Sequence, residues 1–197
     1  MSVAGPQRVG PYGWKNSCDT YHHPTVMAIT LHTPRLTLRE LQMRDAAFVL
    51  ELLNEPSFKK FIGDKQVRNI ADAELYIANG PVASYARHNF GLLLVYLRDP
   101  IATSIGICGL LQRDTLAHPD IGFAYLPAFW GRGYGFEAAG AVLKDARERL
   151  HLQQLLGLTS PENVASIHLL EKLGLHFERI VHLTASDPGT NLFSMSL

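Results

Sequence analysis

A glycine-rich run in the second half of the chain has the residue types best suited to hold an anion. The run reads Trp130-Gly131-Arg132-Gly133-Tyr134-Gly135 and follows a β-prone segment, residues 120–126, that is closed by Pro127. Residues 138–150 then have the apolar spacing of a helix. A turn between a strand and a helix presents free backbone N–H groups beside the positive end of the helix dipole, so it can bind a phosphate. A plain strand-to-helix turn would look the same, so the run alone does not decide between the two.

The segments before this turn predict an antiparallel meander. Strands are expected at 35–39, 90–97, 104–111 and 121–126, with helices at 46–53 and 70–85 between the first two and a short helical turn at 57–62. The pair Gly80-Pro81 should kink or break the second of these helices. The last three strands are joined by short turns, which favours antiparallel neighbours.

The segments after the turn predict a different arrangement. A strand at 154–159 is followed by a helix at 164–173, which ends at Gly174, and by strands at 176–182 and 191–195. Because a strand–helix–strand unit is normally parallel and right-handed, the strands at 121–126 and 154–159 should run parallel and diverge at their carboxyl ends, where clefts form. We therefore predict an α+β fold with a mixed sheet of about seven strands flanked by helices.

Composition limits the classes of function. The chain of 197 residues is 47% hydrophobic and 18% charged, which fits a globular domain. Lys and Arg (18) balance Asp and Glu (18), so no overall field attracts nucleic acid or an anionic membrane, and neither is expected as a partner. The two cysteines, Cys18 and Cys108, are far apart, which favours a reducing, cytoplasmic compartment over a disulfide.

The first residues differ from the rest. Residues 1–26 combine glycines, prolines and aromatic residues without helical or strand periodicity, and they lack the apolar core of a secretory signal. We interpret 1–26 as a flexible tail and 27–197 as one domain. Met27 then becomes a candidate for the true start of the protein.

Three blocks of sequence together resemble one enzyme family. They are Thr33-Pro34-Arg35-Leu36-Thr37-Leu38-Arg39, the segment from Asp120-Ile121-Gly122-Phe123 to the glycine-rich run, and Asn163-Val164-Ala165-Ser166 with Leu170-Glu171-Lys172-Leu173-Gly174-Leu175. In this order the blocks resemble the GNAT superfamily of N-acetyltransferases, and more narrowly its RimJ/RimL-like branch of ribosomal-protein alanine acetyltransferases. The resemblance covers roughly residues 33–196. It implies the GNAT fold, with acetyl-CoA as co-substrate and no metal.

The resemblance also implies a set of cofactor-binding residues. The backbone of the glycine-rich run would bind the CoA diphosphate, the strand before it would pair with the pantetheine amides, and a polar pair on the last helix would complete the site. The residues are Phe123, Ala124, Tyr125, Trp130, Gly131, Arg132, Gly133, Tyr134, Gly135, Asn163 and Ser166. Trp130 stands where relatives often carry Gln or Arg, so anion binding is left to the backbone. Asn163 could instead only cap its helix.

The catalytic residues implied are Asp120 and Ser166. Asp120 stands where many relatives place a glutamate, and it could accept the amine's proton through a water, although a solvated strand-end carboxylate is an equal interpretation. His118 is a second candidate base. Ser166 resembles the serine proposed as the acid in this branch, or it is an ordinary helix serine. Two departures from the family are Leu170, at a position that is often Tyr, and Leu158, where some relatives carry Glu.

Other residues are assigned simpler roles. Arg35, Arg39 and Arg113 are interpreted as surface charges, and Cys108 as a small core side chain. The helical segments before residue 90 would hold the acceptor, with Phe58, Phe61 and Tyr85 as lining residues. A homodimer is neither indicated nor excluded.

The function expected is direct transfer of acetyl from acetyl-CoA to a primary amine, either a protein N-terminus or a small molecule. One alternative is a CoA-binding protein without catalysis, which Leu158 and Leu170 favour and which Asp120 and Ser166 disfavour. A dinucleotide-binding oxidoreductase is a second alternative. It would need the glycine-rich turn after the first strand of a parallel sheet, whereas here the turn comes late, after a meander.

Overall fold

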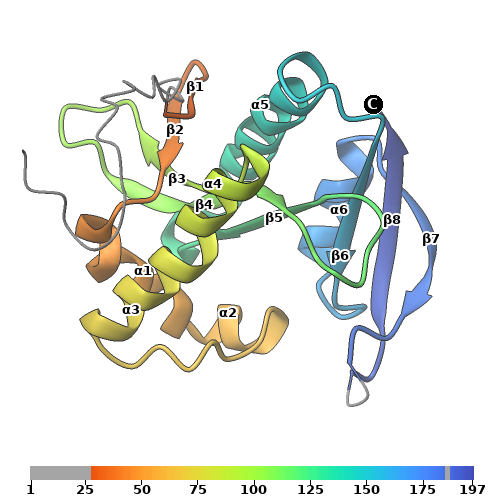
Figure 1. The fold of residues 1–197 in the computed structure, drawn as a ribbon, viewed down its shortest axis with the longest axis horizontal. Coiled ribbons are helices and arrows are strands. Elements are labelled where there is room, and N and C mark those ends of the chain that lie inside the picture. Colours follow the sequence, from red (N-terminus) through yellow and green to blue (C-terminus); the bar gives the residue numbers. More distant parts are fainter. Residues whose placement is uncertain (1–27, 185–186) are drawn as a thin grey trace, which may run out of the picture.

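One mixed sheet of eight strands, ordered β1-β2-β3-β4-β5-β6-β8-β7, runs through the molecule (Figure 1). The computed structural model describes residues 28–184 and 187–197, so the expected tail, Cys18 and Met27 lie outside the described residues. The strands are β1 Thr30–His32, β2 Leu36–Glu40, β3 Leu92–Leu97, β4 Ser104–Leu111, β5 Asp120–Tyr125, β6 Gln154–Thr159, β7 His176–Val181 and β8 Thr190–Ser196. The expected α+β class is confirmed. The sheet has one strand more than predicted, because β1 is a three-residue strand that pairs with β2 across the turn at Thr33.

Helices cover both faces of the sheet. They are α1 Ala46–Asn54, α2 Pro56–Phe61, α3 Ile70–Ile77, α4 Ala83–His88, α5 Tyr134–Glu148 and α6 Val164–Lys172. On one face, α5 packs its alanines and Val142 against buried residues of β2 to β5 such as Leu38 and Ile105. On the other face, α1 and α3 pack against Leu92, Leu94 and Ile107. Apolar side chains therefore fix the sheet between two layers, as the hydrophobic pattern required.

The Gly80-Pro81 pair does not break its helix. Residues Ala78–Val82 form a π-helical turn that joins α3 to α4, and Pro81 is buried within it. Proline lacks the N–H of a normal helical turn, and the wider turn accommodates the ring without ending the helix. The predicted kink or break is thus present only as an interruption of the α-helical pattern by this π-helical turn, after which the chain continues as α4.

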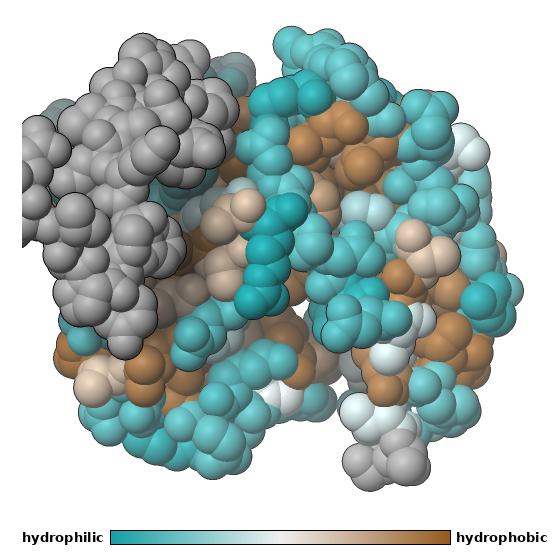
Figure 2. Space-filling view, in the orientation of Figure 1, coloured by the Kyte–Doolittle hydropathy of each residue, from teal (hydrophilic) through white to brown (hydrophobic). Residues whose placement is uncertain are grey.

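The sheet opens between β5 and β6. These strands are parallel, but their pairing is limited to Asp120 with Leu156 and Ile121 with Gly157. Beyond these pairs, β5 stays with β4 while β6 stays with β8, so the two strands diverge toward their carboxyl ends. Figure 2 shows that the surface is indented between the part that carries α1–α3 and the part that carries β6–β8. The predicted cleft is thus formed where the parallel pair splits.

Candidate active site

The glycine-rich turn connects β5 to α5 at the mouth of this split. A single 3₁₀ turn, Pro127–Phe129, follows β5, and Gly133 is the N-cap residue of α5. Gly131 and Gly133 have φ values of +72° and +78°, in the left-handed region. An L side chain is strained there, so these two positions favour glycine.

Backbone N–H groups of the turn are left without acceptors. Among the hydrogen bonds of the described residues, the amide of Trp130 donates to Pro127 O and that of Glu137 donates to Gly133 O, but none is donated by the amides of residues 131–136. A Cβ built on Gly131 would meet no atom within 4 Å, so the space above the turn is open. Consecutive free amides at a helix N-terminus form a concave anion site, which fits a diphosphate.

The carboxyl half of β5 offers further backbone groups. The Leu156 amide of β6 donates to Pro119 O over 2.9 Å. Because every second residue of a strand points its backbone N–H and C=O groups to the same side, Phe123 and Tyr125 also point these groups toward β6. At these residues the parallel ladder has ended. Tyr125 O accepts a 2.8 Å hydrogen bond from the half-exposed Trp130 indole. Phe123 therefore presents its backbone to the cleft, while the Tyr125 carbonyl already has a donor.

The Tyr125 ring points away from the cleft. A Cβ on Gly106 would lie 2.4 Å from the ring, and one on Gly135 would lie 3.5 Å from it, so the ring fills the space between β4 and α5. Burial, followed by the nearby Cys108, raises the pKa of Tyr125 well above its ordinary value. Burial likewise raises the pKa of Cys108 to about 12. Both groups stay neutral and serve packing, so only the backbone of Tyr125 faces the cleft.

Asn163 and Ser166 lie at the start of α6, across the split from β5. Asn163 is the N-cap residue, and its Oδ1 accepts from the Ser166 amide over 3.2 Å. The capping role considered for Asn163 is therefore present, and its Nδ2 remains as a donor. Leu170, one turn after Ser166, is 1% exposed and packs beneath Gly157, so it is a core residue.

The two functions of Asn163 can be separated by substitution. Asn163→Ala should lower the free energy of unfolding by about 1 kcal/mol, because the cap is lost. Asn163→Asp keeps the capping oxygen but removes the Nδ2 donor, so it should retain stability and weaken binding of CoA, the ligand that the sequence resemblance implies. Thermal melts and calorimetric titration with CoA measure the two effects. Equal affinity of Asn163→Asp and the wild type would leave Asn163 with the cap alone.

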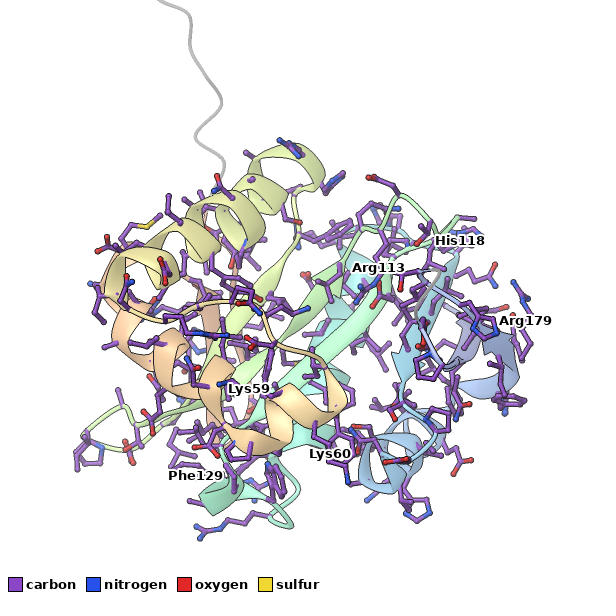
Figure 3. All side chains as sticks on the ribbon, turned by 90° about the horizontal axis from the view of Figure 1, so that it is seen from below. Lys59, Lys60, Arg113, His118, Phe129 and Arg179 are labelled. Carbon is purple, nitrogen blue, oxygen red and sulfur yellow. The ribbon has the colours of Figure 1, made fainter. Side chains whose placement is uncertain are left out.

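Asp120 is the first residue of β5 and is buried, with its side chain 2% exposed. Arg113 donates to it from Nε over 2.8 Å and from Nη2 over 3.3 Å. Burial raises the pKa of Asp120 above its ordinary value, although Arg113 opposes the shift. The interpretation of Asp120 as a solvated strand-end carboxylate is thus wrong, because the β4–β5 loop brings Arg113 over it. Figure 3 shows Arg113 and His118 at this loop.

On the face of the sheet opposite α5, two of the residues expected to line an acceptor pocket are core residues instead. Phe58 is 5% exposed in the core of α1–α3, and the Tyr85 hydroxyl donates to Leu92 O and accepts from the Leu41 amide, so both serve packing. A groove of about 410 Å³ lies instead between α3 and the loop before it, lined by residues that include Lys65, Asp72 and Tyr76. None of its lining residues comes from β5 or α5, so it is separate from the glycine-rich turn.

None of the three arginines interpreted as surface charges is free. Arg39 forms a bidentate pair with Asp45, both contacts being 2.7 Å, and Arg113 holds Asp120. Arg35 pairs with Glu137 in the first turn of α5, 102 residues away. Arg35 thus joins the site in the fold, although nothing in its local sequence marks it as a site residue.

Known proteins with this arrangement identify the family. The acetyltransferase (GNAT) domain matches residues 35–176. The chain belongs to the GNAT acetyltransferase family. An uncharacterized N-acetyltransferase, p20, of Bacillus licheniformis is 26% identical over 154 residues, which cover 77% of this chain and 85% of p20. The resemblance found in the sequence is confirmed, and acetyl transfer is the class of activity of this GNAT domain.

Solved structures agree with the fold of this GNAT domain. An acetyltransferase from Agrobacterium tumefaciens superposes with a TM-score of 0.72 at 26% identity, covering 85% of this chain and 94% of that one. RimL, a ribosomal L7/L12 α-N-protein acetyltransferase solved with coenzyme A, has a TM-score of 0.74 at 12% identity, covering 86% and 98%. The fold is therefore that of the family, and the RimJ/RimL-like assignment agrees with it.

Two further findings concern metals and membranes. Within residues 28–184 and 187–197, no cluster of three or more His, Cys, Asp or Glu side chains is arranged to hold a metal ion. In the same part of the chain, no helix is both long enough and apolar enough to cross a membrane.

Proposed function

We propose that this GNAT domain transfers acetyl directly from acetyl-CoA to a primary amine, carried by a protein N-terminus or by a small molecule. The observation that carries the proposal is the run of acceptor-free amides at residues 131–136, at the mouth of the split between β5 and β6. A site with this shape receives a diphosphate at one end and an extended amide chain along the strand. Acetyl-CoA has both parts.

The described residues fit acetyl-CoA in three places. The amides of the glycine-rich turn would hold the diphosphate without a basic side chain at Trp130. The free backbone of Phe123, next to Ala124 and Tyr125, would pair with pantetheine amides. The Asn163 Nδ2, beside Ser166, would donate to a pantetheine carbonyl. When bound, acetyl-CoA supplies an activated acyl group to the neighbouring amine.

Two side chains are proposed to move protons. The amine nitrogen forms a bond to the acetyl carbon, the carbon–sulfur bond breaks, the amine loses a proton and the thiolate gains one. Asp120 would accept the amine's proton through a water, because its carboxylate is too buried for direct contact. The raised pKa makes it a stronger base than an exposed aspartate. Ser166, on the first turn of α6, would donate its hydroxyl proton to sulfur and regain a proton from water.

Ser166→Ala tests the proposed acid. We expect kcat to fall by at least about tenfold, the lower range for proton-transfer groups, and to fall by a larger factor than the affinity for CoA. The substitution removes the proposed proton donor, whereas the amides that would bind the diphosphate are unchanged. Ser160→Ala is a matched control, since Ser160 Oγ only accepts a 3.3 Å bond from the Glu162 amide in the loop before α6. Full activity of Ser166→Ala would exclude Ser166 as the acid.

A further inference from the structure

Arg35 reaches the anion site from the turn between β1 and β2. Its Nε donates to Glu137 Oε2 over 2.6 Å, and its Nη1 donates to Arg132 O, within the glycine-rich turn, over 3.0 Å. The guanidinium also lies 4.6 Å from the centroid of the Tyr134 ring. The side chain is therefore fixed against the first residues of α5, although it is 48% exposed.

Glu137 organises this contact. Besides the Arg35 guanidinium, its Oε1 accepts from Thr33 Oγ1 over 2.6 Å and from the Arg35 amide over 2.9 Å. Its side chain is 16% exposed. Burial alone would raise the pKa of Glu137, but the hydrogen bonds from Thr33 and Arg35 lower it below its ordinary value. The carboxylate is therefore charged at neutral pH. Both of its oxygens accept hydrogen bonds, which come from Thr33 and Arg35.

One part of the guanidinium is left for a ligand. Nη2 takes part in none of the hydrogen bonds found among the described residues, and a Cβ on Gly133 would lie 3.5 Å from it. Nη2 thus lies next to the N-cap residue of α5, beside the acceptor-free amides. These amides are neutral, whereas a diphosphate is charged, and a guanidinium is well matched to phosphate oxygens.

We propose that Arg35 is a cofactor-binding residue that donates Nη2 to the diphosphate of acetyl-CoA, and that Thr33 and Glu137 are positioning residues that aim it. The inference rests on the proposed function, since it assumes CoA as the ligand. It adds a charged side chain to a site that the turn sequence assigns to backbone alone.

The same helix offers a matched control at its other end. Arg149 donates to Asp145 from Nε over 2.7 Å and from Nη2 over 2.6 Å, and its Nη1 donates to Asn89 O over 3.0 Å. Like Arg35, it combines an ion pair to a carboxylate of α5 with a hydrogen bond to a backbone carbonyl. Arg149→Ala therefore reports what losing such a pair does to the helix without touching the glycine-rich turn.

The test is calorimetric titration of the full chain with CoA and with dephospho-CoA, which lacks the 3′-phosphate. Arg35→Ala should raise the Kd of both ligands by the same factor, about 10- to 100-fold for a hydrogen bond between charged groups, and should weaken the salt dependence of binding. Arg149→Ala should leave both Kd values unchanged. Arg35→Lys, which keeps the charge without the fork, should fall between Arg35→Ala and the wild type.

Glu137→Gln separates positioning from direct binding. It should raise the Kd of CoA, and the double variant with Arg35→Ala should bind no more weakly than Arg35→Ala alone, because Glu137 acts through Arg35. In steady-state assays the KM for acetyl-CoA should rise while kcat at saturation is kept, which a general loss of structure would not produce.

Each contrary outcome has a distinct meaning. If Arg35→Ala binds CoA like the wild type, or no worse than Arg149→Ala, Arg35 is not a ligand. If Arg35→Ala weakens CoA but not dephospho-CoA, the 3′-phosphate is the partner and the assignment to the diphosphate is wrong. If Arg35→Ala does not fold, the same comparisons apply to Arg35→Lys. If the wild type binds neither ligand, the proposed function fails together with this inference.

Discussion

Gly133→Glu is expected to abolish CoA binding while the domain stays folded. The substitution places a carboxylate beside the amides of residues 131–136, where the diphosphate would lie, and like charges in contact cost several kcal/mol. The loss corresponds to a rise in the Kd of CoA of more than about 100-fold. Since Gly133 has a φ of +78°, the new side chain also adds strain, on the order of 1–2 kcal/mol.

Gly63→Glu is a control that separates the effect of backbone strain from the effect of a charge at the anion site. Gly63 has a φ of +99° and open space around its Cα, so the variant carries the same charge and similar strain on the loop after α2. Both variants should lose similar stability in a thermal melt, but only Gly133→Glu should lose CoA in calorimetric titration. Unchanged CoA affinity of Gly133→Glu would contradict the assignment of the turn.

Asp120→Asn is expected to lower kcat/KM for the amine by about 100-fold, the range for removal of a general base, with the Kd of CoA unchanged. The free energy of unfolding of Asp120→Asn should not fall below that of the wild type. The folded-state pKa of Asp120 is raised, so the fold favours the protonated carboxyl, and the stability this contributes is present at low pH and is lost as pH rises through the folded-state pKa. At neutral pH an uncharged amide of the same shape should therefore be at least as stable.

Asp45→Asn serves as the control, because it should lower the stability of the domain and leave its activity unchanged. Asp45 is also a buried carboxylate with a bidentate arginine, but hydrogen bonds from Arg39 and the Gln42 amide outweigh the effect of burial and lower its pKa. Its contribution to stability is present at neutral pH and is lost as pH falls through the folded-state pKa. Asp45→Asn should thus lower the free energy of unfolding by about 1–3 kcal/mol and leave kcat unchanged.

The pH profile gives a second test of Asp120. Because a base acts only when deprotonated, kcat/KM of the wild type should fall as the pH is lowered through the raised pKa of Asp120, and this limb should be absent in Asp120→Asn. Wild-type turnover in Asp120→Asn would assign the Asp120–Arg113 pair to structure alone.

The local parts of the fold were predictable because they depend on local patterns. Alternating apolar residues marked β2, β-prone apolar segments between turns marked β4 and β5, and the glycines of residues 131–135 marked the turn that opens α5. The order of these segments was enough to predict that β5 and β6 diverge, because a meander followed by a strand–helix–strand unit forces a parallel pair. The strand β1 was missed because three residues are too few to show a period.

The side-chain partners at the site were less predictable. Asp120 stands at a strand end, where a carboxylate is usually solvated, and only the folded β4–β5 loop brings Arg113 over it. Arg35 and Glu137 are 102 residues apart, and no periodicity links residues at that separation. Asn163 was ambiguous for another reason, since one amide can cap a helix with its oxygen and donate to a ligand with its nitrogen.

The most direct test of the account is an acceptor screen of the wild-type protein with acetyl-CoA. Thiol release would be followed spectroscopically, and the product would be identified by mass spectrometry, with N-terminal peptides, polyamines, amino acids and aminated antibiotics as acceptors. The account predicts release of CoA that depends on one of these amines, with acetyl recovered on its nitrogen. Tight binding of CoA without turnover on any primary amine would contradict it and favour a CoA-binding protein that does not catalyse transfer.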